Sequence, residues 1–252
     1  MYDLTGKQIL VTGASKGIGK AIARQLLRQG AHIGLHYNRS AQGVEELIEE
    51  FGAERTLPIQ ADLEERKHTE ALFQVALKQM KNIESVVLNA GIFEPHFIDD
   101  PLDSWLKVWQ RTIKINLESA GILTKLFLEH FQKKKQGRLI YISSRAALRG
   151  ETEEYLAYAA SKGGLSSLAK TVARSFGKYN IKAFVVAPGF IKTDMAMEAI
   201  SKIGEEKVLD ELALNRLTTP EDIAPLVALL CSGQLDHSTG TTIDINAGSH
   251  IR

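Results

Sequence analysis

The sequence has few of the features that mark secreted or membrane-bound proteins. Its 252 residues include one cysteine, Cys231, which excludes an internal disulfide and fits a reducing compartment. No apolar run approaches the roughly 18 residues of a membrane span. The amino-terminal stretch MYDLTGKQ is polar, so we expect no signal peptide and a cytoplasmic protein.

An excess of charge of one sign is also lacking. Lys and Arg number 31 against 30 Asp and Glu, so the sequence gives no basis for binding nucleic acid or an anionic membrane. The seven histidines show no H-E-x-x-H or comparable spacing, and no metal site is predicted. The apolar fraction of 44% and charged fraction of 24% are ordinary for a globular protein.

Short apolar runs alternate with segments of helical spacing along the chain. The predicted strands are residues 8–12, 32–36, 56–60, 85–89, 139–143, 183–187 and 242–246. Strand alternating with helix builds parallel βαβ units. We therefore predict a single doubly wound α/β domain of the Rossmann type over residues 1–252, with a seven-stranded, mostly parallel sheet and helices on both faces. Residues 192–215 are expected to form a helical lid over the site.

The first predicted strand runs into a glycine-rich loop, TGASKGIG at residues 12–19. Gly13, Gly17 and Gly19 fall where the chain turns into a helix, and such a loop presents backbone N–H groups to a phosphate. The order is G-x-x-x-G-x-G instead of G-x-G-x-x-G, so a merely tight turn is the alternative. The position within a series of βαβ units favours a dinucleotide site.

The end of the second predicted strand indicates which dinucleotide. An NAD site needs an acid there, about 20 residues past the loop, to bind the ribose 2′-hydroxyl. The chain has Asn38 and Arg39 instead, and its first acid is Glu45 in the next helix. With Lys16 in the glycine loop, two cations and no acid favour the 2′-phosphate of NADP(H).

Residues 153–165, EEYLAYAASKGGL, carry two tyrosines and a lysine in a predicted helix. Tyr158 and Lys162 are four residues apart on one helix face, whereas Tyr155 has no cation at the equivalent position. A nearby ammonium can lower a tyrosine pKa from about 10 by roughly 1–3 units. Tyr158 is thus the candidate general acid or base, although the same spacing occurs in many inert helices.

Other polar and small residues follow the remaining strands. Ser143 and Ser144 end the fifth strand, residues 89–91 follow the fourth, and residues 188–194 follow the sixth. The carboxyl ends of parallel strands meet at one rim, where open α/β sheets bind ligands. We therefore expect these groups to share one site.

The chain carries, in this order, the motifs TGASKGIG, ADL, LNAG, KINL, ISS, YAASK and PGFIKT. In these motifs it resembles the short-chain dehydrogenase/reductase family. The resemblance covers essentially the whole chain and includes the 3-oxoacyl-[acyl-carrier-protein] reductases of fatty acid biosynthesis. It implies NADP(H)-dependent hydride transfer between a carbonyl and a secondary alcohol. The family commonly forms dimers and tetramers.

The resemblance also implies residue roles. Tyr158 would exchange a proton with the substrate oxygen, Ser144 would hydrogen-bond that oxygen, and Lys162 would lower the tyrosine pKa while binding the nicotinamide ribose. Asn116 would hold a water that links Lys162 to solvent. The expected cofactor-binding residues are Gly13, Ser15, Lys16, Gly17, Ile18, Gly19, Asn38, Arg39, Asp62, Leu63, Asn89, Ala90, Gly91, Tyr158, Lys162, Pro188, Gly189, Ile191 and Thr193.

The chain departs from the family pattern in three places. Leu88 replaces an asparagine that commonly precedes NAG, and Ala247 stands where a glycine is usual. The segment between Ser144 and Tyr158 is one residue longer than the commonest spacing, which leaves Ser143 as a second candidate hydrogen-bond donor.

The sequence leaves the substrate and the assembly open. A carbonyl reductase acting on a small carbonyl compound or an acyl thioester, free or bound to a carrier protein, is favoured. An alcohol or sugar dehydrogenase running in oxidation and a Rossmann-fold binding protein without catalysis are the alternatives. A basic group could serve as a carrier-protein docking patch, although a solvated helix end is the simpler explanation; it comprises Lys133, Lys134, Lys135, Lys178 and Lys182. The helix after Tyr158 is apolar on more than one face, which predicts a homotetramer or at least a two-fold dimer.

Overall fold

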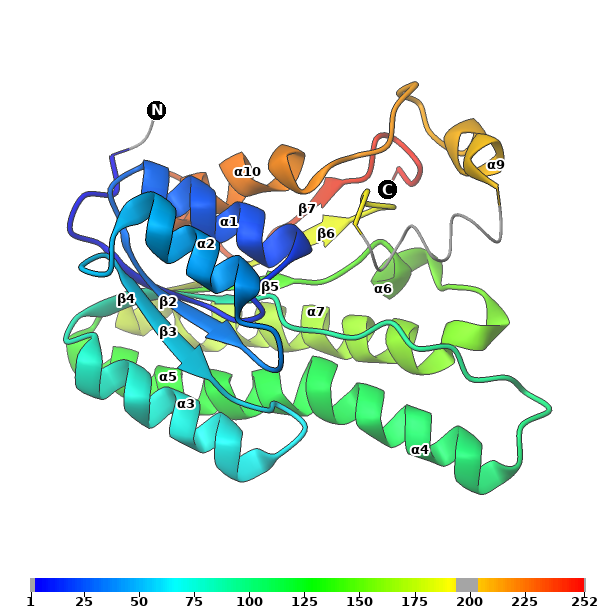
Figure 1. The fold of residues 1–252 in the computed structure, drawn as a ribbon, viewed down its shortest axis with the longest axis horizontal. Helices are drawn as coiled ribbons and strands as arrows, with labels where there is room; N and C mark the ends of the chain where they lie inside the picture. Colours follow the sequence, from blue (N-terminus) through cyan, green and yellow to red (C-terminus); the bar gives the residue numbers. More distant parts are fainter. Residues whose placement is uncertain (1–2, 194–203, 252) are drawn as a thin grey trace.

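The computed structural model describes residues 3–193 and 204–251. Seven parallel strands form one sheet in the order β3-β2-β1-β4-β5-β6-β7 (Figure 1). The strands are β1 Gln8–Val11, β2 His32–Tyr37, β3 Thr56–Gln60, β4 Ile83–Leu88, β5 Gly137–Ile142, β6 Ile181–Pro188 and β7 Thr242–Ile245. Each predicted strand is confirmed to within two residues at either end, and every pairing is parallel.

Helices connect the strands and cover both faces of the sheet. The α-helices are α1 Gly17–Arg28, α2 Gln42–Phe51, α3 Arg66–Gln79, α4 Leu102–Ile113, α5 Ser119–Lys134, α6 Ala146–Arg149, α7 Leu156–Phe176, α9 Glu205–Asp210 and α10 Pro220–Ser232. A π-helical turn, Lys114–Glu118, joins α4 to α5. In the predicted lid, residues 194–203 lie outside the described residues, and α9 lies in the part that follows them.

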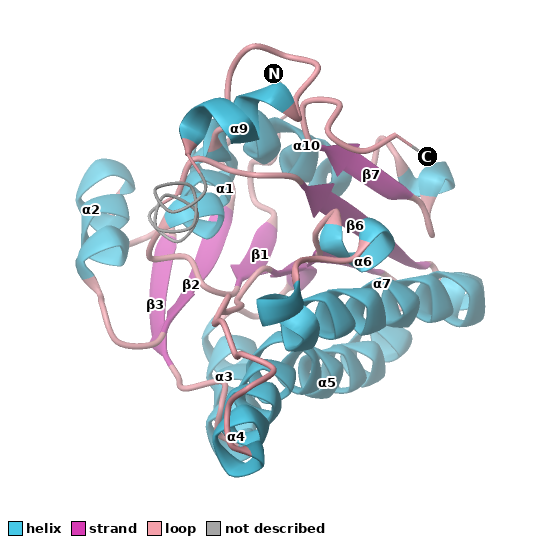
Figure 2. Ribbon diagram, turned by 90° about the vertical axis from the view of Figure 1, so that its right-hand side faces the viewer, coloured by secondary structure: helices cyan, strands magenta, loops and turns pink. Residues whose placement is uncertain are grey.

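Two apolar cores fill the spaces between the sheet and the helical layers on its two faces. Helices α1 and α10 pack on one face, with Ile22, Leu26 and Val227 buried between helix and sheet (Figures 1 and 2). Helices α3, α5 and α7 cover the other face, where Phe127 and Leu165 are buried. The doubly wound architecture predicted from the sequence is therefore confirmed.

The strand order places a topological switch between β1 and β4. The chain moves outward from β1 to β3 and then returns to the far side of β1 to form β4. The connections after β1 and β4 consequently separate at this point, and they leave a crevice at the carboxyl ends of the strands. The short helices α6 and α9 lie beyond this same rim of the sheet (Figure 1).

Local sequence signals explain individual boundaries. The Thr219 backbone N–H donates to the Asp222 carboxylate at 2.7 Å, and Pro220 occupies the first turn of α10, as the sequence predicted. Ala247 has φ of 53°, in the left-handed region that glycine adopts without a Cβ penalty. This backbone conformation explains why a glycine is usual at that position.

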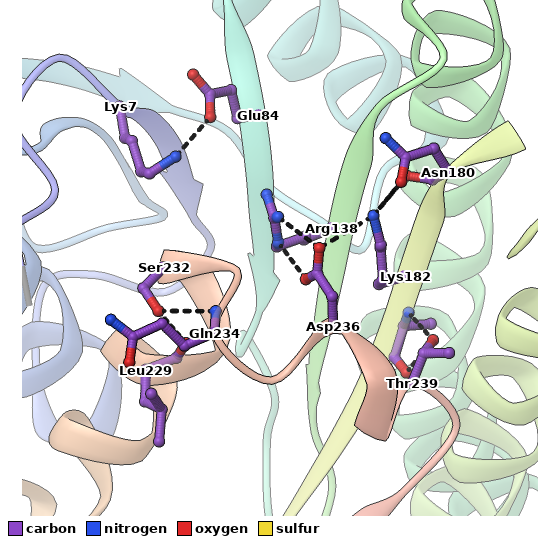
Figure 3. Close-up of polar contacts among 11 residues, drawn as sticks. Lys7, Glu84, Arg138, Asn180, Lys182, Leu229, Ser232, Gln234, Asp236 and Thr239 are labelled. Atoms are coloured by element: carbon purple, nitrogen blue, oxygen red, sulfur yellow. Dashed lines mark hydrogen bonds and ion pairs between the residues drawn. The ribbon is translucent and has the colours of Figure 1, made fainter.

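The basic group considered as a docking patch lies at the edge of the sheet opposite the rim. Lys182 lies at the amino end of β6 and forms an ion pair with Asp236 at 3.0 Å (Figure 3). Arg138 of β5 donates two hydrogen bonds to the same carboxylate, at 2.9 and 2.8 Å. Lys134 donates to Asn82 at 2.6 Å. Lys134 and Lys182 are therefore engaged near the amino ends of β5 and β6, at the opposite end of the strands from the crevice. Docking of a carrier protein at this group stays a hypothesis.

No helix within residues 3–193 and 204–251 combines the length and apolar character needed to cross a membrane.

Candidate active site

The loop after β1 packs so closely against the end of β4 that glycine is required in it. A Cβ on Gly19 would lie 2.0 Å from the Gly13 carbonyl oxygen and 2.5 Å from Nδ2 of Asn89. The Asn89 backbone N–H donates to Oγ1 of Thr12 at 2.9 Å, and its side-chain amide donates to the Thr12 carbonyl at 2.9 Å. Contacts between the ends of β1 and β4 therefore hold the loop in shape.

His36 supports the same loop from β2. Its Nδ1 accepts the Gly13 N–H at 3.0 Å, and its Nε2–H donates to the Ala61 carbonyl at 3.1 Å, so both ring nitrogens are engaged. Burial lowers the pKa of His36 to about 4. The imidazole is therefore neutral at pH 7, and its two hydrogen bonds connect the glycine loop to the end of β3.

A cavity of about 450 Å³ runs along the carboxyl ends of the strands. Lys16 and Arg39 at its wall are exposed and have no ion pair among the described residues, whereas neighbouring Lys20 is paired with Glu46. Of the expected cofactor-binding residues, those that line this cavity are Gly13, Ser15, Lys16, Gly17, Ile18, Gly19, Asn38, Arg39, Asp62, Leu63, Asn89, Ala90, Gly91, Tyr158, Lys162 and Thr193. A glycine cradle beside two exposed cations can hold the phosphates of a dinucleotide.

Ser144, Tyr158 and Lys162 converge where β5 ends beside α7. The Ser144 side chain lies near the Tyr158 phenol, and both residues line the smaller of two cavities at this rim. Lys162 is 4% exposed; its Nζ donates to the Ile142 carbonyl at 2.9 Å and lies 5.7 Å from the centroid of the Tyr158 ring. The helical spacing therefore places the phenol and the ammonium on one face, as predicted, next to the end of β5.

Burial has the largest effect on the pKa of Tyr158. Burial raises it to about 12; the hydrogen bond with Ser144 opposes this rise, and the charge of Glu151 adds to it. Burial also lowers the pKa of Lys162 to about 8. Desolvation of the phenolate is the largest effect on this pKa. The expected lowering of the tyrosine pKa by Lys162 stays a prediction. The phenol stays protonated at pH 7.

Asn116 sits in the π-helical turn between α4 and α5. Its Oδ1 accepts the Ile92 N–H at 2.8 Å, and its Nδ2 donates to the Ile92 carbonyl at 2.9 Å and to Ser161 Oγ at 3.2 Å. A Cβ on Gly91 would lie 3.2 Å from Asn116 Oδ1 and 3.5 Å from Lys162 Nζ. Asn116 thus ties the segment after β4 to α7 close to Lys162.

The structure separates the paired candidates. The Ser143 hydroxyl donates to the Lys162 carbonyl at 3.0 Å and hydrogen-bonds Ser166 at 2.8 Å, so it serves packing between β5 and α7. Tyr155 stacks on Phe93 with ring centroids 3.7 Å apart, and Phe93 meets Tyr158 edge-on at 4.7 Å. The geometry therefore favours Ser144 over Ser143, and Tyr158 over Tyr155, as the reacting groups.

A second, smaller cavity of about 110 Å³ adjoins the first. Three of the expected cofactor-binding residues, Pro188, Gly189 and Ile191, line this cavity and not the larger one. Tyr158 and Thr193 belong to the walls of both cavities. The phenol therefore lies at the boundary between the larger and the smaller cavity.

Several residues at these cavities received no role from the sequence, among them two arginines, a histidine and a phenylalanine. His36 and Arg111 line the larger cavity, and Phe93 and Arg145 line the smaller one. The guanidinium of Arg111 is held by Glu64 at 3.0 Å and by Glu94. Three of these four residues could have been suspected from the sequence because they lie beside a motif. His36 precedes Asn38, Phe93 follows NAG, and Arg145 follows ISS.

Comparison with known proteins agrees with this site. A family of the short-chain dehydrogenase/reductase type, described as Enoyl-(Acyl carrier protein) reductase, matches residues 13–250. Nodulation protein G of Rhizobium sp. (strain N33) is 34% identical over 98% of each chain. The 3-oxoacyl-[acyl-carrier-protein] reductase FabG of Aquifex aeolicus is 30% identical over 97% of this chain and 98% of its own.

A solved structure from Agrobacterium tumefaciens, provisionally assigned as a gluconate dehydrogenase, has a TM-score of 0.89, 24% identity and coverage of 98% and 97% of the two chains. That likeness supports the fold alone. The chain belongs to the short-chain dehydrogenase/reductase family, whose members are oxidoreductases that use nicotinamide cofactors.

Proposed function

We propose that this protein is an NADP(H)-dependent carbonyl reductase. The observation that carries the proposal is the position of Tyr158 at the boundary of the two cavities, with Ser144 beside it in the wall of the smaller one. Carbonyl reduction requires a proton donor at the substrate oxygen, between the nucleotide and the substrate. A Rossmann-fold protein that only binds nucleotide has no need for this arrangement.

In the proposed reaction a bound nicotinamide, when reduced, supplies a hydride to the carbonyl carbon. Ser144 hydrogen-bonds the carbonyl oxygen, and Tyr158 gives its proton to that oxygen as the carbon–oxygen double bond becomes single. Lys162, charged below its pKa of about 8, stabilises the negative charge left on the Tyr158 oxygen. Asn116 is proposed to hold the water through which the proton is replaced.

The preference for NADP(H) rests on charge. Arg39 and Lys16 are exposed cations at the wall of the nucleotide cavity, and the end of β2 offers Asn38 where an acid would select NAD. Asn38 donates to Asp62 at 3.3 Å, which leaves Arg39 as the charged group at the strand end. Arginine suits a phosphate because its guanidinium donates two parallel hydrogen bonds.

The remaining features complete the proposal. We propose one domain, a homotetramer or two-fold dimer, and a cytoplasmic location in keeping with the single, buried Cys231. The resemblance to 3-oxoacyl-[acyl-carrier-protein] reductases makes 3-oxoacyl thioesters one substrate class to examine.

The test is NADPH consumption by the purified protein with a panel of simple ketones, β-ketoesters, oxo acids and acyl thioesters. Tyr158→Phe removes the proton donor and keeps the ring packed on Phe93, so turnover should fall by about 10²–10⁴ while NADPH still binds. Tyr155→Phe is the matched control: it keeps the stack on Phe93 and should keep most activity.

Three outcomes would contradict the proposal. If Tyr155→Phe were inactive and Tyr158→Phe active, the proton donor would be misassigned. If nucleotide bound while no carbonyl compound was reduced, the binding-protein alternative would gain; turnover only of alcohols or sugars with NADP⁺ would favour the dehydrogenase alternative.

A further inference from the structure

Arg145 is a buried charge in the wall of the smaller cavity. It directly follows Ser144, is 2% exposed, and donates its backbone N–H to the Pro188 carbonyl at 2.9 Å. Its guanidinium carbon lies 4.4 Å from the centroid of the Phe190 ring. Backbone and ring contacts therefore hold this cation between the ends of β5 and β6.

The hydrogen bonding of Arg145 is incomplete. Its Nη2 reaches Oε2 of Glu211 at 3.3 Å, which is long compared with the roughly 2.7–2.9 Å of a good charge-assisted bond. The same oxygen is shared with Arg149 at 3.4 Å, and the Glu211 side chain is 47% exposed. Nη1 of Arg145 is buried without a hydrogen-bond partner among the described residues. An unsatisfied buried charged donor is rare in native proteins.

The surroundings of Arg145 favour a compact anionic ligand. The cavity wall is otherwise largely apolar, with Phe93, Phe190 and Ile191, and it contains one carboxylate, Glu151, which lies 4.0 Å from Arg149. The charges of Arg145 and Arg149 equal those of Glu151 and Glu211, so this group has no net charge. An anion would therefore be attracted by the nearby guanidinium and not by a long-range field. A short bond from a ligand carboxylate would satisfy donors that Glu211 reaches only at long distance.

Resting on the proposed carbonyl reduction, we infer that Arg145 binds a carboxylate of the substrate, which makes the substrate a short oxo acid and not a thioester. Ser144, Tyr158 and Arg145 all line the smaller cavity, whose volume is about 110 Å³. A cavity of this size that offers Ser144 and Tyr158 to a ketone oxygen and Arg145 to a carboxylate suits a compact molecule with both groups. A 2- or 3-oxo acid has this composition.

The experiment compares 3-oxobutanoate with its methyl ester and its thioester under NADPH. The wild type should reduce the acid with a kcat/KM about ten- to a hundredfold above the ester. Arg145→Met should abolish most of this preference by lowering the rate with the acid, with the ester changed by no more than about threefold. Arg149→Met, which also loses Glu211 as a partner but does not line the cavity, should leave the preference unchanged.

Binding supplies an independent readout. With NADP⁺ present, 3-hydroxybutanoate should raise the melting temperature of the wild type and of Arg149→Met, but not that of Arg145→Met. Should Arg145→Met fail to fold, Arg145→Lys, which keeps the charge and loses the planar fork, should show a partial loss of preference.

The outcomes separate this inference from the proposed function. A wild type that reduces ester or thioester as well as the acid would overturn the role of Arg145 and leave carbonyl reduction standing. Equal losses for acid and ester in Arg145→Met would mean that Arg145 acts only by positioning Ser144. Failure to reduce any ketone would overturn both.

Discussion

His36 should make the fold sensitive to mild acid. Its pKa is about 4 in the folded protein against an ordinary 6.5, so between these values the unfolded chain binds a proton that the folded chain does not. The contribution of His36 to the free energy of unfolding is therefore fully present above pH 6.5 and is lost as the pH falls through 4. From these two pKa values, lowering the pH from 7 to 4.5 should cost the folded state about 2 kcal/mol through His36 alone.

The matched variant is His36→Gln, whose amide can accept from Gly13 and donate to Ala61 but does not titrate. Urea unfolding of both proteins at pH 7 and pH 4.5 isolates the histidine, because carboxylates that titrate in the same range contribute equally to both. The wild type should lose about 2 kcal/mol more than the variant. Its affinity for NADP⁺ should also weaken more, since a protonated Nδ1 cannot accept the Gly13 N–H that shapes the loop.

Identical pH dependence in the two proteins would refute this reasoning. So would an NMR titration in which the His36 ring protonates near pH 6.5, because that value would mean that burial and its two hydrogen bonds leave the imidazole unperturbed.

Three further predictions follow from the same geometry. The wild type should prefer NADPH over NADH by roughly 10–10³, and Arg39→Ala should weaken NADPH binding by about tenfold or more while leaving NADH binding nearly unchanged. Equal losses in kcat/KM for both nucleotides would mean that Arg39 holds the loop. A wild-type preference for NADH would overturn the assignment. The reduction rate should fall as the pH rises above about 8, because Lys162 loses its proton there while Tyr158 keeps its own to about 12; a flat profile to pH 10 would contradict this. Light scattering should show a tetramer or dimer, since α7 leaves Leu156 41% exposed beside its buried face; a monomer at micromolar concentration would exclude the assembly.

The sequence by itself determined the fold and the rim of the sheet where the site lies. Strand and helix periodicity, with glycine at the loop after β1 and at helix ends, are local signals that survive in any packing arrangement. The carboxyl ends of parallel strands must meet at one edge, so residues 89–91, Ser144 and residues 188–193 could be placed together before any contact was known. The spacing of Tyr158 and Lys162 is likewise a property of one helix.

Only the tertiary structure decided what each polar group does within that site. The chain offers Ser143 and Ser144 as neighbours, and the contacts with Lys162 and Ser166 from α7 are what engage the first of them. Those contacts join residues about 20 positions apart, and no local pattern encodes them.

The direction of the pKa shifts was also beyond the sequence. Spacing placed an ammonium near the Tyr158 phenol, but burial of both groups raises one pKa and lowers the other. Desolvation depends on every atom that displaces water, including strands and loops far along the chain. Arg145 shows the same limit. The sequence assigned it no role, and contacts with the end of β6 and with Glu211 after α9 are what make it a buried, partly unsatisfied donor.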